Sequence, residues 1–337
     1  MKKLIVVLAL MLAPASAFAH HGGVSLAFGP GSPVETGSPL TLPEGGLVTG
    51  FRIEQIDWKK YSHNEDGTPK NDNATNHTFM NANISFGFTP ALTGTLSIPY
   101  YIKRQETLGS NEGLADIKLG LTYGFHHDPE SGFSRNTDKD SAVSMDAQKN
   151  RTWLAISGMM SIPNGDHNKT RPGDNGHPDR GMQTGFGAPS FTLGLAAARA
   201  FGPVTLNAEV GADIFMPRSD QDGTLQYGSE LRGNLAGIYE LYGNNNSFLS
   251  KLDGIFELNF LHLDHDRADG VNDAGSGGDI LYLTPGLRFA FPAIQNANLG
   301  IAVKLPVWTN LNDKKVNAQG SEGVENYRLI STLSFYF

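Results

Sequence analysis

The sequence predicts an all-β protein, a single antiparallel transmembrane β-barrel of about twelve strands that follows a cleaved signal peptide. Three observations lead to this prediction. The 337-residue chain opens with an export-type segment, contains about twelve runs of alternating apolar and polar residues, and closes on RLISTLSFYF. Side chains alternate between the two faces of a strand, so each run has one apolar face that must be covered. An uncovered apolar strand at a chain terminus is an aggregation hazard in water, which favours a membrane setting.

Residues 1–19 carry the parts of a secretory signal peptide. Two lysines precede an apolar run from Leu4 to Leu12, and small residues occupy positions 17 and 19. Cleavage after Ala19 would make His20 the first mature residue, and cleavage after Ala17 is the alternative. Later stretches fall short of the roughly 20 apolar residues of a membrane helix. A bilayer crossing would therefore require strands closed into a barrel, because every backbone polar group needs an internal partner there.

Composition agrees with export and excludes several classes of partner. The chain has no cysteine, so neither disulfides nor thiolate chemistry are available. Its formal net charge of -8 argues against nucleic acid as a partner, because phosphate contacts need clustered Lys and Arg. The 40 glycines fit a protein of strands and turns. No cofactor is expected.

Residues 20–46 precede the first strand and are too rich in Gly and Pro for a regular element. This segment could be a mobile periplasmic leader. It could also be a plug, with Val24, Leu26 and Phe28 docked in the lower lumen, because twelve strands enclose more space than side chains fill. At its start, His20 and His21 with the α-amine offer ligands suited to Cu(II) or Ni(II). A solvated terminus without metal is the alternative.

The barrel is expected over residues 47–337. The predicted strands cover residues 47–60, 78–89, 92–103, 114–125, 152–162, 187–201, 203–215, 229–242, 248–262, 279–291, 298–309 and 324–337. Most are near the 9 to 11 residues that cross an outer membrane at a tilt. In the seventh run Val204, Leu206 and Ala208 share one face and Asn207 and Glu209 the other. Charges on one face suit a wet lumen.

Connection lengths indicate the orientation. Short turns such as TPA and GP alternate with long polar loops such as SHNEDGTPKNDNATN. In bacterial outer-membrane barrels the short turns are periplasmic, so both chain ends are expected in the periplasm. Residues 126–150 break this rule, since they are long but fall on the periplasmic side. They could form an ordered periplasmic element, a disordered insert or an unrecognised hairpin.

Charged residues on the polar faces are expected to point into the lumen, because a charge facing lipid near mid-membrane costs about 2 to 4 kcal/mol for Arg or Lys. These residues are Arg52, Glu54, Lys118, Glu209, Asp213, Arg232, Glu257, Arg288, Lys304 and Arg328. Their mixed signs suggest internal ion pairs rather than strong ion selectivity.

Aromatic residues near the strand ends suggest two girdles at the membrane interfaces. The outer girdle would contain Trp58, Tyr61, Phe79, Tyr100, Tyr282, Trp308 and Tyr327, and the inner one Phe88, Phe125, Trp153, Phe201, Phe291 and Phe337. The ending LSFYF is similar to the C-terminal signal that the barrel-assembly machinery reads. Its expected residues are Tyr327, Leu329, Leu333, Phe335 and Phe337.

The chain resembles an outer-membrane barrel family associated with meta-cleavage phenol degradation, whose members are described as transporters. The resemblance is carried by EGLADIKLGLTYGF at 112–125, SIPNGD at 161–166, GFGAPSFTLGLAAARAFG at 185–202, and LTPGLRFAFP with NLGIAVKLPVW within 283–308. It covers about half of the mature chain. The resemblance implies a porin-like barrel that passes small solutes, aromatic or hydrophobic ones among them, and it supplies no catalytic residue.

Enzymatic and metal-binding interpretations have weaker support. The motifs G-x-S-x-G, H-E-x-x-H and the Walker loop are absent, although His262 near Asp264 with Ser250 or Ser276 leaves a hydrolase open. The acidic loop around Asp266 resembles a calcium loop only loosely. We therefore predict a channel or transporter of the bacterial outer membrane, with lipid, the assembly machinery and an unidentified small solute as partners. The alternative is a side-chain-filled surface barrel with a structural or metal-related role.

Overall fold

The computed structural model describes residues 32–58, 75–105, 109–137, 151–170, 178–220, 223–244, 246–294, 296–312 and 325–337. The predicted signal peptide, and His20 and His21 with the predicted docking residues Val24, Leu26 and Phe28, lie outside these residues. Tyr61 does as well.

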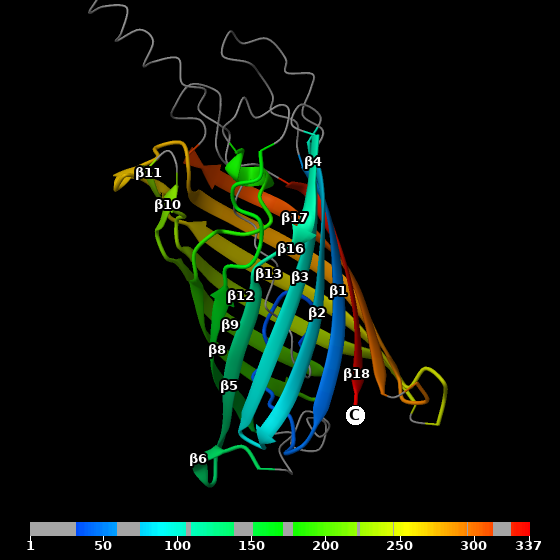
Figure 1. Cartoon of the computed structure of the whole chain (residues 1–337). Coiled ribbons are helices and arrows are strands. Elements are labelled where there is room, and N and C mark those ends of the chain that lie inside the picture. The colour runs from blue at the N-terminus through cyan, green and yellow to red at the C-terminus, as the bar shows by residue number, and fades with distance from the viewer. Residues whose placement is uncertain are drawn as a thin grey trace, which may run out of the picture.

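Twelve antiparallel strands close into one barrel, as the alternation predicts (Figure 1). They are β1 (Leu47–Trp58), β2 (Thr75–Thr89), β3 (Leu92–Gln105), β5 (Ile117–Asp128), β7 (Thr152–Ile162), β8 (Ser190–Phe201), β9 (Val204–Phe215), β12 (Glu230–Gly243), β13 (Lys251–Leu263), β16 (Gly278–Phe291), β17 (Ala297–Leu311) and β18 (Glu325–Tyr336). Each strand pairs with its neighbours in sequence, and β1 pairs with β18 from Val48 opposite Tyr336 to Trp58 opposite Glu325. This last ladder removes the free edge that the apolar C-terminal strand would otherwise expose.

The fourth strand is interrupted where the prediction treats it as continuous. A short β4 (Gly109–Leu114) pairs with the end of β3, and β5 begins only after Ala115 and Asp116. The buried Asp116 carboxylate accepts hydrogen bonds from the N–H groups of Gly165 (2.9 Å) and Phe186 (2.9 Å). The break thus ties the wall to the connection between β7 and β8.

Residues 126–150 contain a hairpin in their described part. Strand β5 continues to Asp128, and β6 (Gly132–Arg135) folds back on it, with Phe125 opposite Arg135 and Asp128 opposite Gly132. Gly132 takes a positive φ of 77°, which glycine adopts without strain. Of the three hypotheses for residues 126–150, the described residues therefore support the unrecognised hairpin.

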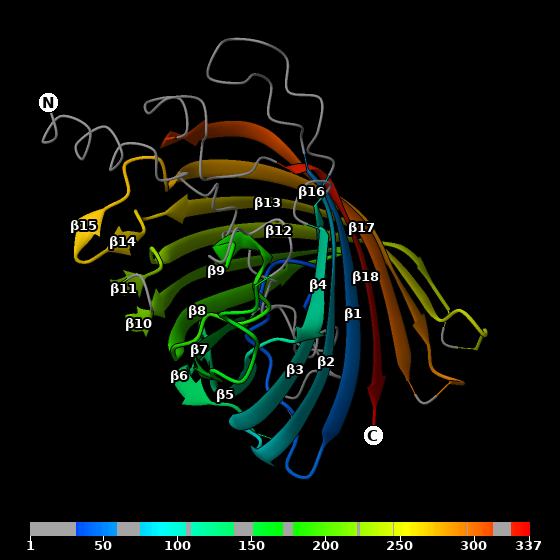
Figure 2. The ribbon, with the colours of Figure 1, turned by 45° about the horizontal axis from the view of Figure 1, so that its top comes forward.

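The two ends of the barrel differ. We call the end with the short connections at 90–91 and 202–203 the turn rim, and the opposite end the loop rim. At the loop rim, β10 (Arg218–Asp220), β11 (Gly223–Gln226), β14 (Arg267–Ala268) and β15 (Val271–Asn272) form a second small sheet (Figure 2). A 3-10 turn, η4 (Arg180–Met182), lies between β7 and β8. Among the described residues, no helix has the length and apolar character to cross a membrane.

The outer face of the wall is apolar, with exposed leucine, isoleucine, valine and phenylalanine side chains on most strands. The assignment of several aromatic residues to the girdles is wrong, however. Trp58, Phe79, Tyr282 and Trp153 are buried inside the barrel. The reason is strand parity: Trp58, for example, shares its face with Arg52 and Glu54, so one cannot face lipid while the others face the interior. Trp308, Tyr327, Phe88, Phe201 and Phe337 are exposed.

Candidate functional site

The barrel interior concentrates the ionisable residues, because the apolar faces of the strands are turned outward. Of the ten residues expected in the lumen, Arg52, Glu54, Asp213, Glu257, Lys304 and Arg328 are buried, and Lys118, Glu209, Arg232 and Arg288 are partly buried. Lys118 lies in register between the buried Ser97 and Ser161.

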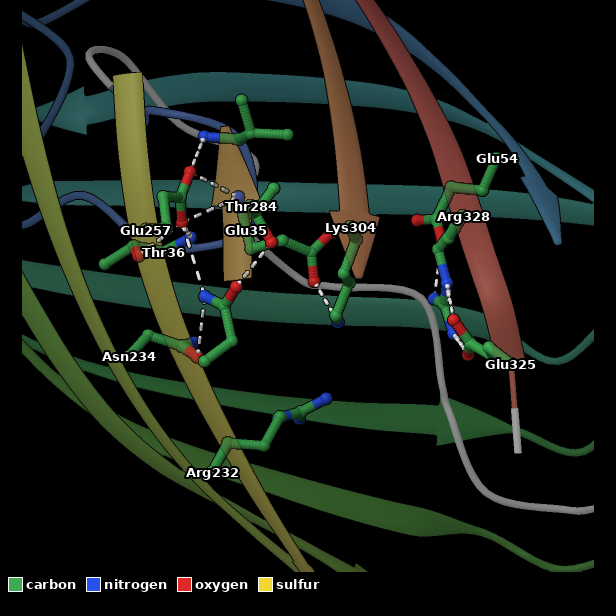
Figure 3. Close-up of polar contacts among 12 residues, drawn as sticks. Glu35, Thr36, Glu54, Arg232, Asn234, Glu257, Thr284, Lys304, Glu325 and Arg328 are labelled. Carbon is green, nitrogen blue, oxygen red and sulfur yellow. Dashed lines mark hydrogen bonds and ion pairs between the residues drawn. The ribbon is translucent and has the colours of Figure 1, made fainter. Parts of the chain in front are cut away.

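Residues 32–46 lie inside the barrel and approach its middle at residues 34–37. The Glu257 carboxylate of β13 accepts hydrogen bonds from the N–H groups of Val34 (2.7 Å), Glu35 (3.1 Å) and Thr36 (2.8 Å), and from the Thr36 hydroxyl (2.6 Å). Figure 3 shows this carboxylate against the backbone of the segment. The next amide, of Gly37, donates to the Glu209 carboxylate at 2.7 Å. Four consecutive backbone donors are thus satisfied by two acidic side chains of the wall, as buried polar groups require.

The Glu35 side chain binds the opposite part of the wall. Its carboxylate pairs with the Arg52 guanidinium and with Lys304 Nζ at 2.7 Å. Glu35 belongs to no strand, and burial alone would raise the pKa of its carboxyl. The positive charges of Lys304, Arg52 and Arg328 outweigh burial and hold this pKa well below its usual range. The segment is therefore held by charges of both signs.

A second network closes the seam of the barrel. Arg52 of β1 also binds Glu54, and Arg328 of β18 binds Glu54 at 2.6 Å as well as Glu325. All four side chains are fully or almost fully buried. Removing one member would leave a buried charge without its partner, which costs several kcal/mol, on the order of 3 to 5.

Polar residues of β9, β12, β13 and β16 continue the network around the wall. Asn234 donates to Glu209 at 3.0 Å, and Asn259 donates to Asn234 at 3.2 Å. Thr284 completes this chain by donating to Asn259 at 2.8 Å. Arg232 pairs with Asp213. The side chains that contact residues 34–37 are therefore themselves fixed by their neighbours.

The rest of the segment packs at the turn rim. Leu40 contacts Trp153 and Ala198 in a buried cluster. Gly45 donates its N–H to the Gly87 carbonyl at 2.9 Å, and Gly87 donates to the Gly46 carbonyl at 2.9 Å. A Cβ atom at Gly87 would lie 2.0 Å from the Pro43 carbonyl oxygen. Only glycine allows the segment to approach β2 this closely.

A small cavity remains between the segment and the wall. It is lined by Glu35, Gly37, Glu209, Arg232, Lys304 and Tyr282 among others, and its volume is about 80 Å³. A water needs roughly 10–15 Å³ in this measure, so this cavity has room for a few waters.

Toward the loop rim the interior becomes aromatic. Phe79 lies 4.3 Å from Tyr101 and 6.0 Å from His77, between ring centroids, and the His77 ring lies 5.6 Å from Trp58. Tyr282 carries Lys304 Nζ 4.4 Å from its ring centroid. Trp58, Phe79 and Tyr101 pack in one cluster, and Tyr282 lines the cavity.

The connection between β7 and β8 covers part of this aromatic region. Lys103 Nζ donates to the Gly181 carbonyl at 2.9 Å, and the Asn111 amide donates to the Met182 carbonyl at 2.8 Å. Phe186 packs on Phe215, 4.7 Å between ring centroids. Residues 181–186 therefore bridge the strands at the loop rim.

Glu35 and Glu325 are interior carboxylates that the strand pattern does not predict. Glu35 lies in an irregular segment, where no periodicity indicates its direction. Glu325 stands three residues before Arg328, which puts it on the opposite parity of a regular strand. It reaches the interior because the register between β1 and β18 shifts at Asp57 and Trp58.

The residues considered for metal binding or hydrolysis make other contacts in the structure. Among the described residues no group of three or more His, Asp or Glu could hold a metal ion. The Asp266 carboxylate accepts the Gly228 N–H at 2.7 Å, and the Ser276 hydroxyl donates to the Asp273 carbonyl at 2.8 Å. Ser250 lies at the turn rim and donates to the Ala290 carbonyl, whereas His262 lies at the other end of β13 beside Asp279. These contacts organise loops and do not assemble a hydrolase triad.

The expected assembly residues lie along the outward face of β18. Tyr327, Leu329, Leu333 and Phe337 are exposed, and Phe335 is partly exposed. The backbone of Phe337 exchanges hydrogen bonds with Leu47 at 2.8 and 3.2 Å, so the last residue takes part in the closing ladder.

No protein-family model matches the chain, and no curated protein matches it. Solved structures do. An outer membrane channel from Pseudomonas putida F1 is similar over 90% of this chain and 100% of its own, with 13% identity and a TM-score of 0.66. The TodX monoaromatic hydrocarbon channel, as a deltaS2 mutant, covers 94% and 98% at 11% identity with a TM-score of 0.42. The NanC porin covers 86% and 98% at 8% identity with a TM-score of 0.40. The first of these similarities supports the barrel fold of this chain.

Proposed function

We propose that the protein is a barrel of the bacterial outer membrane that passes small solutes and is closed at rest by residues 32–46. The observation that carries this proposal is the mode of closure. Residues 34–37 lie in the interior as an irregular chain segment held through backbone amides and ion pairs, and a segment with few regular hydrogen bonds can leave without disrupting the sheet. In this proposal the turn rim faces the periplasm, as short turns do in such barrels.

The class of solute is part of the proposal. The resemblance to the phenol-degradation family suggests small aromatic or hydrophobic molecules. The rings of Phe79, Tyr101, Trp58 and Tyr282 on the loop-rim side support this choice, because aromatic surfaces retain such solutes. The charged residues beyond them are paired, which favours neither ion sign.

Planar-bilayer recordings and liposome uptake test the proposal. The full mature protein should conduct rarely, and a form beginning at Gly45 should conduct more and close less often. Liposomes with the truncated form should take up phenol faster than a sugar. A heat-modifiable, folded truncated barrel that neither conducts nor passes phenol would overturn the proposal.

The cavity of only about 80 Å³ also favours a second candidate. In that case the lumen stays filled, and the protein serves as a structural or metal-related surface barrel. Silent bilayers with both forms of the protein would support it.

A further inference from the structure

Basic residues gather on the outward face of the wall at the turn rim. On β5 to β9, all of whose residues are described, outward positions are apolar or small except for His127, Arg135 and Arg199 and the hydroxyls of Thr152 and Tyr123. The carboxylates in the middle of these strands, Glu209 and Asp213, face the interior. The lipid-facing wall is therefore positive at this end.

The three basic residues are close together because of the strand register. His127 pairs with Thr152, and Thr152 pairs with Arg199, so two strand spacings of about 5 Å separate His127 from Arg199. Arg135 lies on β6, on the other side of β5, opposite Phe125. Figure 1 shows β5, β6 and β8 on one side of the barrel. A single lipid headgroup can contact this row.

These side chains have no acidic partner among the described residues. Arg199 lies 5.3 Å above the Phe201 ring, and its Nε is buried without a hydrogen-bond partner. The His127 ring packs on Phe133, 4.7 Å between centroids. The nearby Asp128 is engaged by Arg151 at 3.2 Å. The row therefore presents guanidinium and imidazole groups beside aromatic rings at the turn rim.

An apolar groove lies further along the same strands. Its volume is about 670 Å³, and Phe86, Leu96, Leu121 and Leu193 are among its lining residues. Gly158 lies between Leu121 and Leu193 in the ladder and leaves the surface hollow. A Cβ atom at Gly158 would meet nothing closer than 3.8 Å.

The spacing of the two features matches a phospholipid. Leu121 precedes His127, and Leu193 precedes Arg199, by six residues, which is about 20 Å along a strand. At a tilt of about 40° this corresponds to about 15 Å of depth, half of the roughly 30 Å hydrocarbon core. A headgroup at the row thus places its acyl chains in the groove.

We propose that the outward face of β5 to β8 binds one anionic phospholipid of the periplasmic leaflet, with its phosphate on Arg135, His127 and Arg199 and an acyl chain in the groove over Gly158. The site rests on the membrane setting proposed above and goes beyond the channel function. The bound lipid would lie against β5, the strand that forms a hairpin with β6.

Native mass spectrometry of the full mature protein with dioleoyl phosphatidylglycerol tests the site. One lipid should remain bound to the wild type. A membrane-proximal basic residue contributes about 1 kcal/mol, roughly fivefold in affinity, so the double variant Arg135→Gln/Arg199→Gln should bind about 25-fold more weakly. Arg104→Gln is the matched control, because Arg104 is exposed at the loop end of β3, and should retain the lipid.

Two further measurements distinguish binding of the headgroup from binding of the acyl chain in the groove. Gly158→Phe should weaken binding of the dioleoyl lipid but leave binding of dihexanoyl phosphatidylglycerol unchanged, since only the long chain reaches the groove. Inorganic phosphate should not displace the lipid. Equal retention by the folded double variant, or displacement by phosphate alone, would overturn the proposal, while bilayer conductance would still report on the channel independently.

Discussion

Replacing Glu257 with glutamine measures how much the Glu257 carboxylate contributes to binding residues 34–37 inside the barrel. Glutamine keeps one acceptor oxygen and replaces the other with an amide that faces four donors, of which the N–H and the hydroxyl of Thr36 are the nearest, at 2.8 and 2.6 Å. Hydrogen bonds to a charged group contribute about 1.5–3 kcal/mol each, so the docked segment should lose about 3–6 kcal/mol. At 1.4 kcal/mol per tenfold change in an equilibrium constant, the undocked fraction should rise at least about 100-fold.

The chain contains no cysteine, which provides a clean assay. Val34 is 2% exposed in a cluster with Ile238, Ile255, Ala302 and Ile330, so a Val34→Cys background can react with a maleimide only when the segment leaves its site. The labelling rate should follow the undocked fraction. Bilayer recordings of the same proteins should show more frequent opening.

Asp213→Asn is the matched control. It removes one interior negative charge, but Asp213 accepts a hydrogen bond from Thr192 and pairs with Arg232, both of which lie outside the segment. Its labelling rate should stay near that of the background protein. If Glu257→Gln labels no faster than this control, the carboxylate does not hold the segment and our account of the closure is wrong.

Three further predictions concern the segment and the terminus. Because the folded pKa of Glu35 is depressed, its contribution to docking is complete above the ordinary glutamate pKa of about 4.3 and declines as pH falls toward the lower value. The labelling rate is divided at each pH by that of the unfolded Val34→Cys protein, because only the thiolate reacts; this relative rate should be constant from pH 8 to 5.5 and rise in more acid buffer. Gly87→Val places a side chain against the Pro43 carbonyl and should weaken docking by about 1–3 kcal/mol, seen as faster labelling of a barrel with normal heat modifiability. Phe335→Asp with Phe337→Asp should allow export but block membrane insertion, measured by fractionation.

Each of these has a contrary outcome. A relative labelling rate that already rises as the pH falls from 8 to 6 would show that another group controls docking. If the Gly87→Val protein is labelled at an unchanged rate, the chain around Pro43 accommodates the added side chain without weaker docking. Normal amounts of heat-modifiable barrel from the double aspartate variant would count against the C-terminal signal.

The sequence alone determined the strands, because alternation with period two is a local property of an extended chain. All twelve expected runs correspond to barrel strands, and the clearest, such as Val204–Phe215, agree to within one residue. The same rule indicates the directions of Trp58 and Trp153, which share faces with polar interior residues. Assigning them by their position near strand ends ignored parity, and this produced the error in the girdles.

Only the tertiary structure decided which of these residues meet. Glu54 and Arg328 are 274 residues apart and touch because β1 closes on β18 in one particular register. Glu257 meets Val34 across 223 residues because an irregular segment lies inside the closed barrel. Register across a closed sheet and the path of a chain without periodicity depend on the packing of the whole molecule, so no local pattern encodes them.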